Sequence, residues 1–139
     1  MKATPTRFFV FDTSVLIDQG QTNRFTDITR MLGGVVRHSA VAIAELYRGA
    51  RDRRALRAID ELVKHGTILV PTREMWLLSG RILARLAVQH SLNPETHRRL
   101  HFDLLIALTA RGIGAAVVTT DRDHFELLQT QVRFSLVVW

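Results

Sequence analysis

The chain has 139 residues, of which 47% are hydrophobic and 23% charged, a balance that suits one folded domain and excludes a disordered chain. Its formal net charge is +6, and every basic residue except Lys2 and Lys64 is an arginine, which favours an acidic partner such as nucleic acid or reflects an arginine-rich coding bias. No cysteine is present, which excludes disulfides and thiolate metal sites and is compatible with a reducing cytoplasm.

The first predicted element is a run of four apolar residues, Phe8–Phe11, that leads directly into Asp12. A short run without polar alternation is typical of a strand buried on both faces, as in a parallel sheet. Thr13 and Ser14 then favour the start of a helix. Further along, periodicity, caps and turn residues predict helices over 15–18, 21–32, 40–49, 51–65, 73–90, 93–111 and 123–129, and strands over 35–38, 67–70, 115–120 and 135–139.

Short apolar strands therefore alternate with helices or helix pairs along the whole chain. This alternation predicts a single α/β domain over residues 1–139, with three α/β/α layers and right-handed crossovers. The sheet is expected to be mainly parallel with about five strands. The strands that precede Asp12 and Asp121 are expected to be neighbours.

Four carboxylates stand out because apolar residues surround them. Asp12 follows FFVF, Glu45 lies in VAIAEL, Asp103 is followed by LLIA, and Asp121 follows AAVVTT. Singly, each is explained by a cap or by a salt bridge to an arginine. Together they indicate a site, because parallel strands end at the same edge of a sheet. Glu45 and Asp103 are expected early in helices that follow loops and lean toward that edge.

Four clustered carboxylates without a basic partner repel one another and raise their own pKa values. A divalent cation relieves that repulsion. Because all the candidate ligands are oxygen atoms, Mg²⁺ is the expected ion, with Mn²⁺ as the alternative.

Three segments, FVFDTSVLID, SAVAIAELYRGA and FDLLIALTARGIGAAVVTTDRDHF, occur in this order between Phe9 and Phe125. The chain resembles the PIN-domain ribonucleases, and most closely the VapC toxins of bacterial and archaeal toxin–antitoxin pairs. The resemblance implies a metal-dependent endoribonuclease. By motif, the catalytic and metal-binding residues are Asp12, Glu45, Asp103 and Asp121.

The resemblance also assigns supporting roles to Ser14, the small hydroxyl residue after the first aspartate, and to Thr119, the threonine of the threonine-x-aspartate motif. Gly49 matches the glycine after the glutamate helix. Many members carry Thr or Ser about three residues before the glutamate, where Ala42 stands here. Ser39 is the expected replacement as the cap of that helix.

The implied reaction is hydrolysis of RNA phosphodiester bonds by an activated water. Asp12 and Asp103 are expected to bind the ion directly, whereas Glu45 and Asp121 bind it, complete a second metal site or orient water. Asp123 is expected to be a surface or capping residue, and His101 and His124 are expected to be structural. Arginines 48, 51, 53, 54 and 57 line the RNA path or, equally, form a solvated helix face.

Three other functions fit part of the pattern. A catalytically silent RNA-binding domain needs the arginines but not four acids. A structure-specific DNA nuclease shares the acids, but such enzymes are larger and carry more of them. A phosphoacceptor receiver domain needs an acidic pair after the first strand and a lysine near the last, and both are absent.

An active ribonuclease damages its own cell, so the resemblance implies a cognate VapB-like antitoxin in the cytoplasm. The helix over 73–90 is apolar on more than one side: Met75, Leu78, Ile82 and Leu86 form one stripe, and Trp76, Leu77 and Leu83 lie outside it. We expect this helix, together with the helix over 51–65, to contribute to a homodimer contact and to a hydrophobic groove that binds the antitoxin. Burial inside the monomer is the alternative. No signal peptide or membrane segment is expected.

Overall fold

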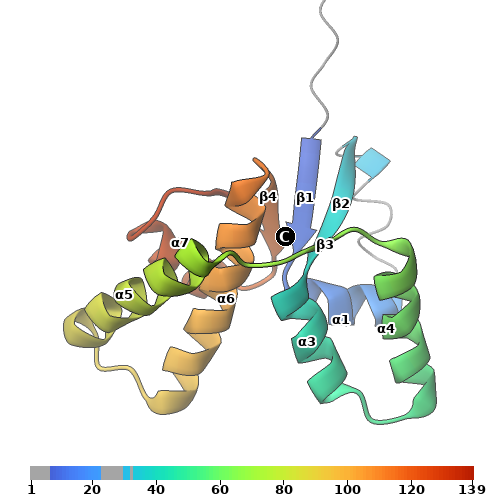
Figure 1. The fold of residues 1–139 in the computed structure, drawn as a ribbon, viewed down its shortest axis with the longest axis horizontal. Coiled ribbons are helices and arrows are strands. Elements are labelled where there is room, and N and C mark those ends of the chain that lie inside the picture. Colours follow the sequence, from blue (N-terminus) through green and yellow to red (C-terminus); the bar gives the residue numbers. More distant parts are fainter. Residues whose placement is uncertain (1–6, 23–29, 32) are drawn as a thin grey trace, which may run out of the picture.

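The computed structural model describes residues 7–22, 30–31 and 33–139, and its five strands form one sheet (Figure 1). The strands are β1 (Arg7–Phe11), β2 (Gly34–Ser39), β3 (Ile68–Leu69), β4 (Ala116–Thr119) and β5 (Ser135–Val138). They lie in the order β3-β2-β1-β4-β5, and every neighbouring pair is parallel. The predicted parallel sheet is confirmed, and so is the pairing of the strands that precede Asp12 and Asp121.

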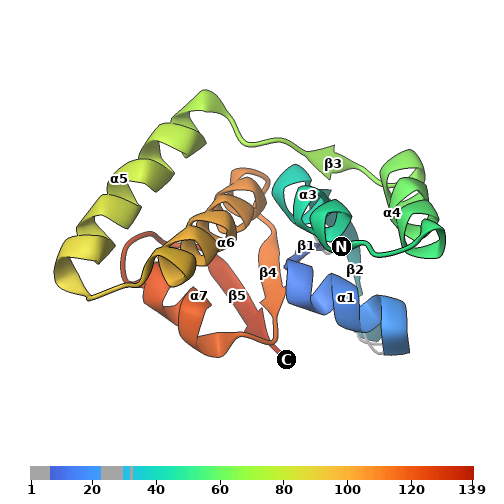
Figure 2. The same cartoon turned by 90° about the horizontal axis from the view of Figure 1, so that it is seen from below.

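Six helices are formed by the described residues: α1 (Thr13–Thr22), α3 (Ala40–Gly49), α4 (Arg53–His65), α5 (Arg73–Gln89), α6 (Pro94–Gly112) and α7 (Arg122–Gln129). Helix α1 lies on one side of the central strands, and α5, α6 and α7 lie on the other (Figure 2). Among the described residues, none of the helices combines the length and apolar character needed to cross a membrane.

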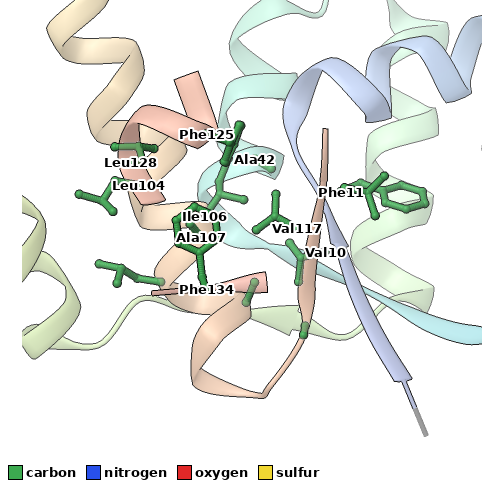
Figure 3. Close-up of a cluster of buried hydrophobic side chains, with 14 of the residues drawn as sticks. Val10, Phe11, Ala42, Leu104, Ile106, Ala107, Val117, Phe125, Leu128 and Phe134 are labelled. Atoms are coloured by element: carbon green, nitrogen blue, oxygen red, sulfur yellow. The ribbon is translucent and has the colours of Figure 1, made fainter. Parts of the chain in front are cut away.

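The core explains why the first strand carries no polar alternation. Val10 and Phe11 are both buried, and their side chains leave β1 on opposite sides (Figure 3). On the α6 side, Val10 and Val117 belong to the same cluster as Ile106 and Phe125. A strand covered on both faces excludes polar residues from either face.

The helix boundaries follow the capping residues read from the sequence. The side chains of Ser39, Thr72 and Asn93 accept backbone hydrogen bonds at the starts of α3, α5 and α6. The expectation that Ser39 caps the glutamate helix is therefore confirmed. Asp52 caps α4 by accepting from the backbone N–H of Ala55 at 2.8 Å.

The first helix and the third strand differ most in length from the sequence expectations. Helix α1 covers Thr13–Thr22 and is therefore longer than the helix predicted over 15–18. The strand predicted over 67–70 is reduced to Ile68–Leu69, because it forms the sheet edge and pairs only with the end of β2. Most of the helix predicted over 21–32 lies outside the described residues. Gly34 at the start of β2 allows close packing, because a Cβ atom there would overlap the ring of Phe9.

Candidate functional site

Asp12 is the most buried acidic residue at the carboxyl edge of the sheet, with 3% of its surface exposed. It follows β1 directly, where the chain turns into α1. Its Oδ1 accepts from Ser14 Oγ at 2.7 Å and from the backbone N–H of Val15 at 3.0 Å. Its Oδ2 accepts from Thr119 Oγ1 at 2.5 Å. Both carboxylate oxygens are therefore oriented by donors from two neighbouring strand ends.

Burial raises the pKa of Asp12 above its usual value, because an apolar environment disfavours the charged form. The donors of Thr119, Val15 and Ser14 oppose that rise, and the charge of Asp103 adds to it. Asp12 is thus a carboxylate that the fold orients closely, but no cation among the described residues offsets its charge.

Glu45 lies in α3, and its Oε1 accepts from Thr13 Oγ1 at 2.8 Å. Burial raises its pKa, and the nearby charges of Asp103 and Asp12 raise it further. Thr13 thus orients the second acid of the site, a role that we did not assign from the sequence. The sequence carried no signal for this contact, because it joins two residues that lie 32 positions apart on different helices.

Asp103 and Asp121 are joined by a histidine that we expected to be only structural. His124 Nδ1 lies 3.2 Å from Asp103 Oδ2 and 3.3 Å from Asp121 Oδ2. The hydrogen bond to Asp103 raises the pKa of His124. Burial raises the pKa of Asp103, and His124 opposes that rise. The expectation of four acids without a basic partner is therefore wrong for these two, because the first turn of α7 points His124 between them.

The four acids come from different elements, yet each lies within the electrostatic reach of another. The charge of Asp103 raises the pKa values of Asp12 and Glu45, and the charge of Asp121 raises that of Asp103. The expectation that Glu45 and Asp103 lie early in helices after loops is wrong. Helix α3 follows β2 without a loop, and Asp103 lies near the middle of the long α6.

The remaining sequence candidates lie where expected or away from the acids. Asp123 is exposed in the first turn of α7, as a surface residue. His101 Nε2 lies 2.8 Å from the hydroxyl of buried Ser79, so it joins α6 to α5.

The chemistry of the acids fits a hard divalent cation. Burial and a neighbouring acid raise the pKa values of Asp12, Glu45 and Asp103, so their ionised forms are unfavourable in the folded chain. A bound divalent cation would stabilise these ionised forms. Within residues 7–22, 30–31 and 33–139, no three acidic or histidine side chains are already spaced to enclose an ion. Asp12, Glu45, Asp103 and Asp121 thus lie close enough for their charges to interact, but in this arrangement the described acids do not enclose an ion.

A polar cleft of about 380 Å³ adjoins the acids. Its charged lining consists of two glutamates, Glu45 from α3 and Glu95 from the first turn of α6, and three arginines, Arg48 from α3 and Arg98 and Arg99 from α6. Sequence reasoning named Arg48 but missed the two arginines of α6, because their place beside Glu45 depends on how α3 and α6 pack.

A second pocket, of about 340 Å³, is mainly apolar and shares Glu45, Arg48 and Phe102 with the first. Its far wall includes Trp76 of α5, which is 48% exposed, and Leu77 next to it is 55% exposed. Leu83, which we grouped with these two, is buried inside the monomer. Of the three apolar residues expected outside the stripe on α5, only Trp76 and Leu77, in its first turns, are exposed.

Comparisons with known proteins agree with this architecture. A family model described as the PIN domain matches residues 9–129. No match was found among curated proteins.

Several solved structures share the fold. VapBC-1 from nontypeable Haemophilus influenzae superposes with a TM-score of 0.70 at 20% identity, covering 95% of this chain and 98% of that one. DNA-bound VapBC from Salmonella typhimurium superposes with a TM-score of 0.70 at 20% identity, covering 96% of this chain and 99% of that one. VapBC-5 from Mycobacterium tuberculosis superposes with a TM-score of 0.63 at 22% identity, covering 95% of this chain and 98% of that one. It is described as a member of a family of toxin–antitoxin systems.

Proposed function

The chain belongs to the PIN-domain family, and from this premise we propose that it is a metal-dependent endoribonuclease acting as the toxin of a toxin–antitoxin pair. The observation that carries the proposal is the state of Asp12. It is almost fully buried, bound by three donors, and close enough to Asp103 for that charge to raise its pKa. A carboxylate kept in this state suits a cation ligand better than a structural cap.

Asp12 and Asp103 are proposed to hold Mg²⁺, or Mn²⁺ in its place, directly. Glu45 and Asp121 complete the binding or orient the attacking water. The chemistry that such an ion supplies is neutralisation of phosphate charge and activation of water. Ser14 and Thr119 orient Asp12, and Thr13 orients Glu45, as hydrogen-bonding partners of metal ligands do.

The proposed partners follow from the fold relatives and from α5. The three solved structures described above carry the name VapBC, which supports a VapB-like antitoxin as partner of this chain. The exposed Trp76 and Leu77, beside the apolar pocket, support a protein contact, and we assign it to the homodimer.

Incubation of the purified chain with total cellular RNA and Mg²⁺, followed by mapping of new 5′ ends, tests the proposal. New ends are expected with the wild type, and not with Asp12→Asn or in EDTA. RNA binding without new ends would identify a catalytically silent RNA-binding domain instead. Cleavage of branched DNA but not of RNA would identify a structure-specific DNA nuclease.

A further inference from the structure

The polar cleft between α3 and α6 places arginines in a row next to the acids. On α3, Arg48 lies three residues after Glu45, and on α6, Arg99 lies four residues before Asp103. Residues three or four apart are neighbours on one face of a helix, about one turn of 5.4 Å apart. Each helix thus presents an acid of the site and, one turn away, an arginine.

The arrangement of the two helices puts both arginines on the same side of the acids. Helix α3 leaves the carboxyl end of β2 and runs away from the sheet, whereas α6 starts beyond that edge and runs back along the sheet (Figures 1 and 2). Arg48 and Arg99 are therefore both farther from the sheet than the acid on their own helix. Arg98 adds a third cation to the same wall.

These arginines are available to a ligand. All three are exposed, and within the described part of the chain none forms an ion pair, unlike Arg73 and Arg122. Their charges do reach the site: Arg48 opposes the rise that burial causes in the pKa of Glu45, and Arg99 opposes that of Asp103. A guanidinium without a carboxylate partner suits bidentate binding of a phosphate.

Phe102 adds an aromatic surface to the cleft. It lies on α6 beside Arg98 and Arg99, is only partly buried, and also borders the apolar pocket. The three arginines of the cleft outnumber its two glutamates, Glu45 and Glu95. A groove with an excess of positive charge and an accessible aromatic ring is the combination that binds single strands, because unpaired bases stack on the ring while the backbone follows the cations. Paired bases of a duplex are not free to do so.

We propose that the cleft binds single-stranded RNA on one side of the scissile bond, with Arg48, Arg98 and Arg99 contacting backbone phosphates. The inference rests on the proposed ribonuclease function and adds to it the residues of this chain that hold the strand and the direction in which the strand leaves the acids. The sequence pattern suggested an RNA path along the arginines of α4, whereas the proposed path follows those of α6.

The test is binding of a fluorescein-labelled 20-nucleotide RNA to the full-length chain in EDTA, in the wild type and in an Asp12→Asn background, over a series of KCl concentrations. The double variant Arg98→Ala/Arg99→Ala should weaken binding about tenfold or more. It should also reduce the slope of log K against log[KCl] by about 0.7 for each phosphate that the variant no longer neutralises. Arg98→Lys/Arg99→Lys should retain most of the slope, because lysine keeps the charge.

Two double variants with the same loss of charge serve as comparisons. Arg81→Ala/Arg85→Ala, on the exposed side of α5, should change binding less than twofold. Arg53→Ala/Arg57→Ala, on α4, tests the rival path. Equal weakening by all three pairs, or by the α4 pair alone, would overturn the proposal, and so would equally tight binding of the duplex of the same sequence. Thermal unfolding of each variant checks that the fold is intact.

The outcomes separate this inference from the proposed function. Binding that depends on Arg98 and Arg99, without metal-dependent cleavage by the wild type, would refute the nuclease and leave the cleft as an RNA site. Cleavage that depends on Asp12, with RNA affinity unchanged in Arg98→Ala/Arg99→Ala, would refute the cleft and leave the nuclease.

Discussion

Thr119 Oγ1 donates a 2.5 Å hydrogen bond to Asp12 Oδ2, although 107 residues separate the two in the chain. The same hydroxyl oxygen accepts from the backbone N–H of Asp121 at 2.9 Å. Thr119 ends β4, and β4 pairs in parallel with β1, which ends just before Asp12. One side chain thus links two of the proposed metal ligands.

Replacement of Thr119 by valine tests that link. Thr119→Val keeps the shape but leaves Asp12 Oδ2 and the amide of Asp121 without this partner, so we expect a loss of about 1–3 kcal/mol in the free energy of unfolding. Affinity for Mn²⁺, measured by calorimetry, should fall about 10- to 100-fold. Thr119→Ser should restore both, and Thr130→Val, at an exposed hydroxyl, should change neither. Unchanged affinity in Thr119→Val would remove Thr119 from the site.

Asp12→Asn should make the metal-free protein more stable. The pKa of Asp12 is raised by burial, so its ionised form at pH 7 is less favourable in the folded chain than in the unfolded one. Asparagine removes that cost, and thermal unfolding in EDTA should show a midpoint higher by about 3 °C for each kcal/mol gained. Mg²⁺ should then stabilise the variant less than the wild type. A lower midpoint in EDTA would mean that the charge of Asp12 is already compensated within the protein.

His124→Ala should have the opposite effect on the metal-free protein. It leaves Asp103 and Asp121 facing each other without the imidazole between them, so the midpoint in EDTA should fall. The rise in midpoint on addition of Mn²⁺ should be larger than in the wild type, because the cation then relieves more repulsion. His124→Asn, which keeps a donor near the Nδ1 position, is the matched variant. Its midpoint in EDTA and its rise with Mn²⁺ should lie between those of the wild type and His124→Ala. Identical Mn²⁺ shifts in all three proteins would show that His124 does not influence ion binding.

His38 should make stability depend on pH. Burial lowers its pKa from the usual 6.5, and its Nδ1 has no hydrogen-bond partner among the residues that the structure describes. Below pH 6.5 the unfolded chain therefore binds a proton that the folded chain resists, so stability falls as the pH decreases, by at most about 1.4 kcal/mol per pH unit. His38→Leu should flatten urea-unfolding free energies between pH 7.5 and 5.5. His90→Leu, the same change at an exposed position, should retain the slope. An unchanged slope in His38→Leu would locate the pH dependence elsewhere.

Trp76 and Leu77 test the proposed homodimer. Both are about half exposed at the start of α5, and Trp76 borders the apolar pocket. Light scattering across a dilution series should show a dimer for the wild type, and Leu77→Asp should convert it to monomer. Val88→Asp, at an 89% exposed position near the end of the same helix, should leave the dimer intact. A wild-type monomer at all concentrations would refute the dimer and leave the nuclease proposal untouched.

Much of the fold could be read from local sequence. The unbroken apolar run before Asp12 indicates a strand covered on both sides, and β1 is indeed the central strand. Ser39, Thr72 and Asn93 marked the starts of three helices because a capping side chain acts within its own turn. The short β3 was misjudged, since strand length at a sheet edge depends on the partner strand.

The sequence by itself singled out Asp12, Glu45, Asp103 and Asp121, because a carboxylate among apolar residues is costly wherever it lies, and that cost is visible locally. Only the tertiary structure placed Thr13 on Glu45, His124 between Asp103 and Asp121, and Arg98 and Arg99 beside Glu45. Each of these contacts joins elements that are distant in the chain or depends on the direction in which a helix presents a side chain. A hydrogen bond or a charge contact acts over a few ångströms in space, and sequence spacing contains no record of that distance.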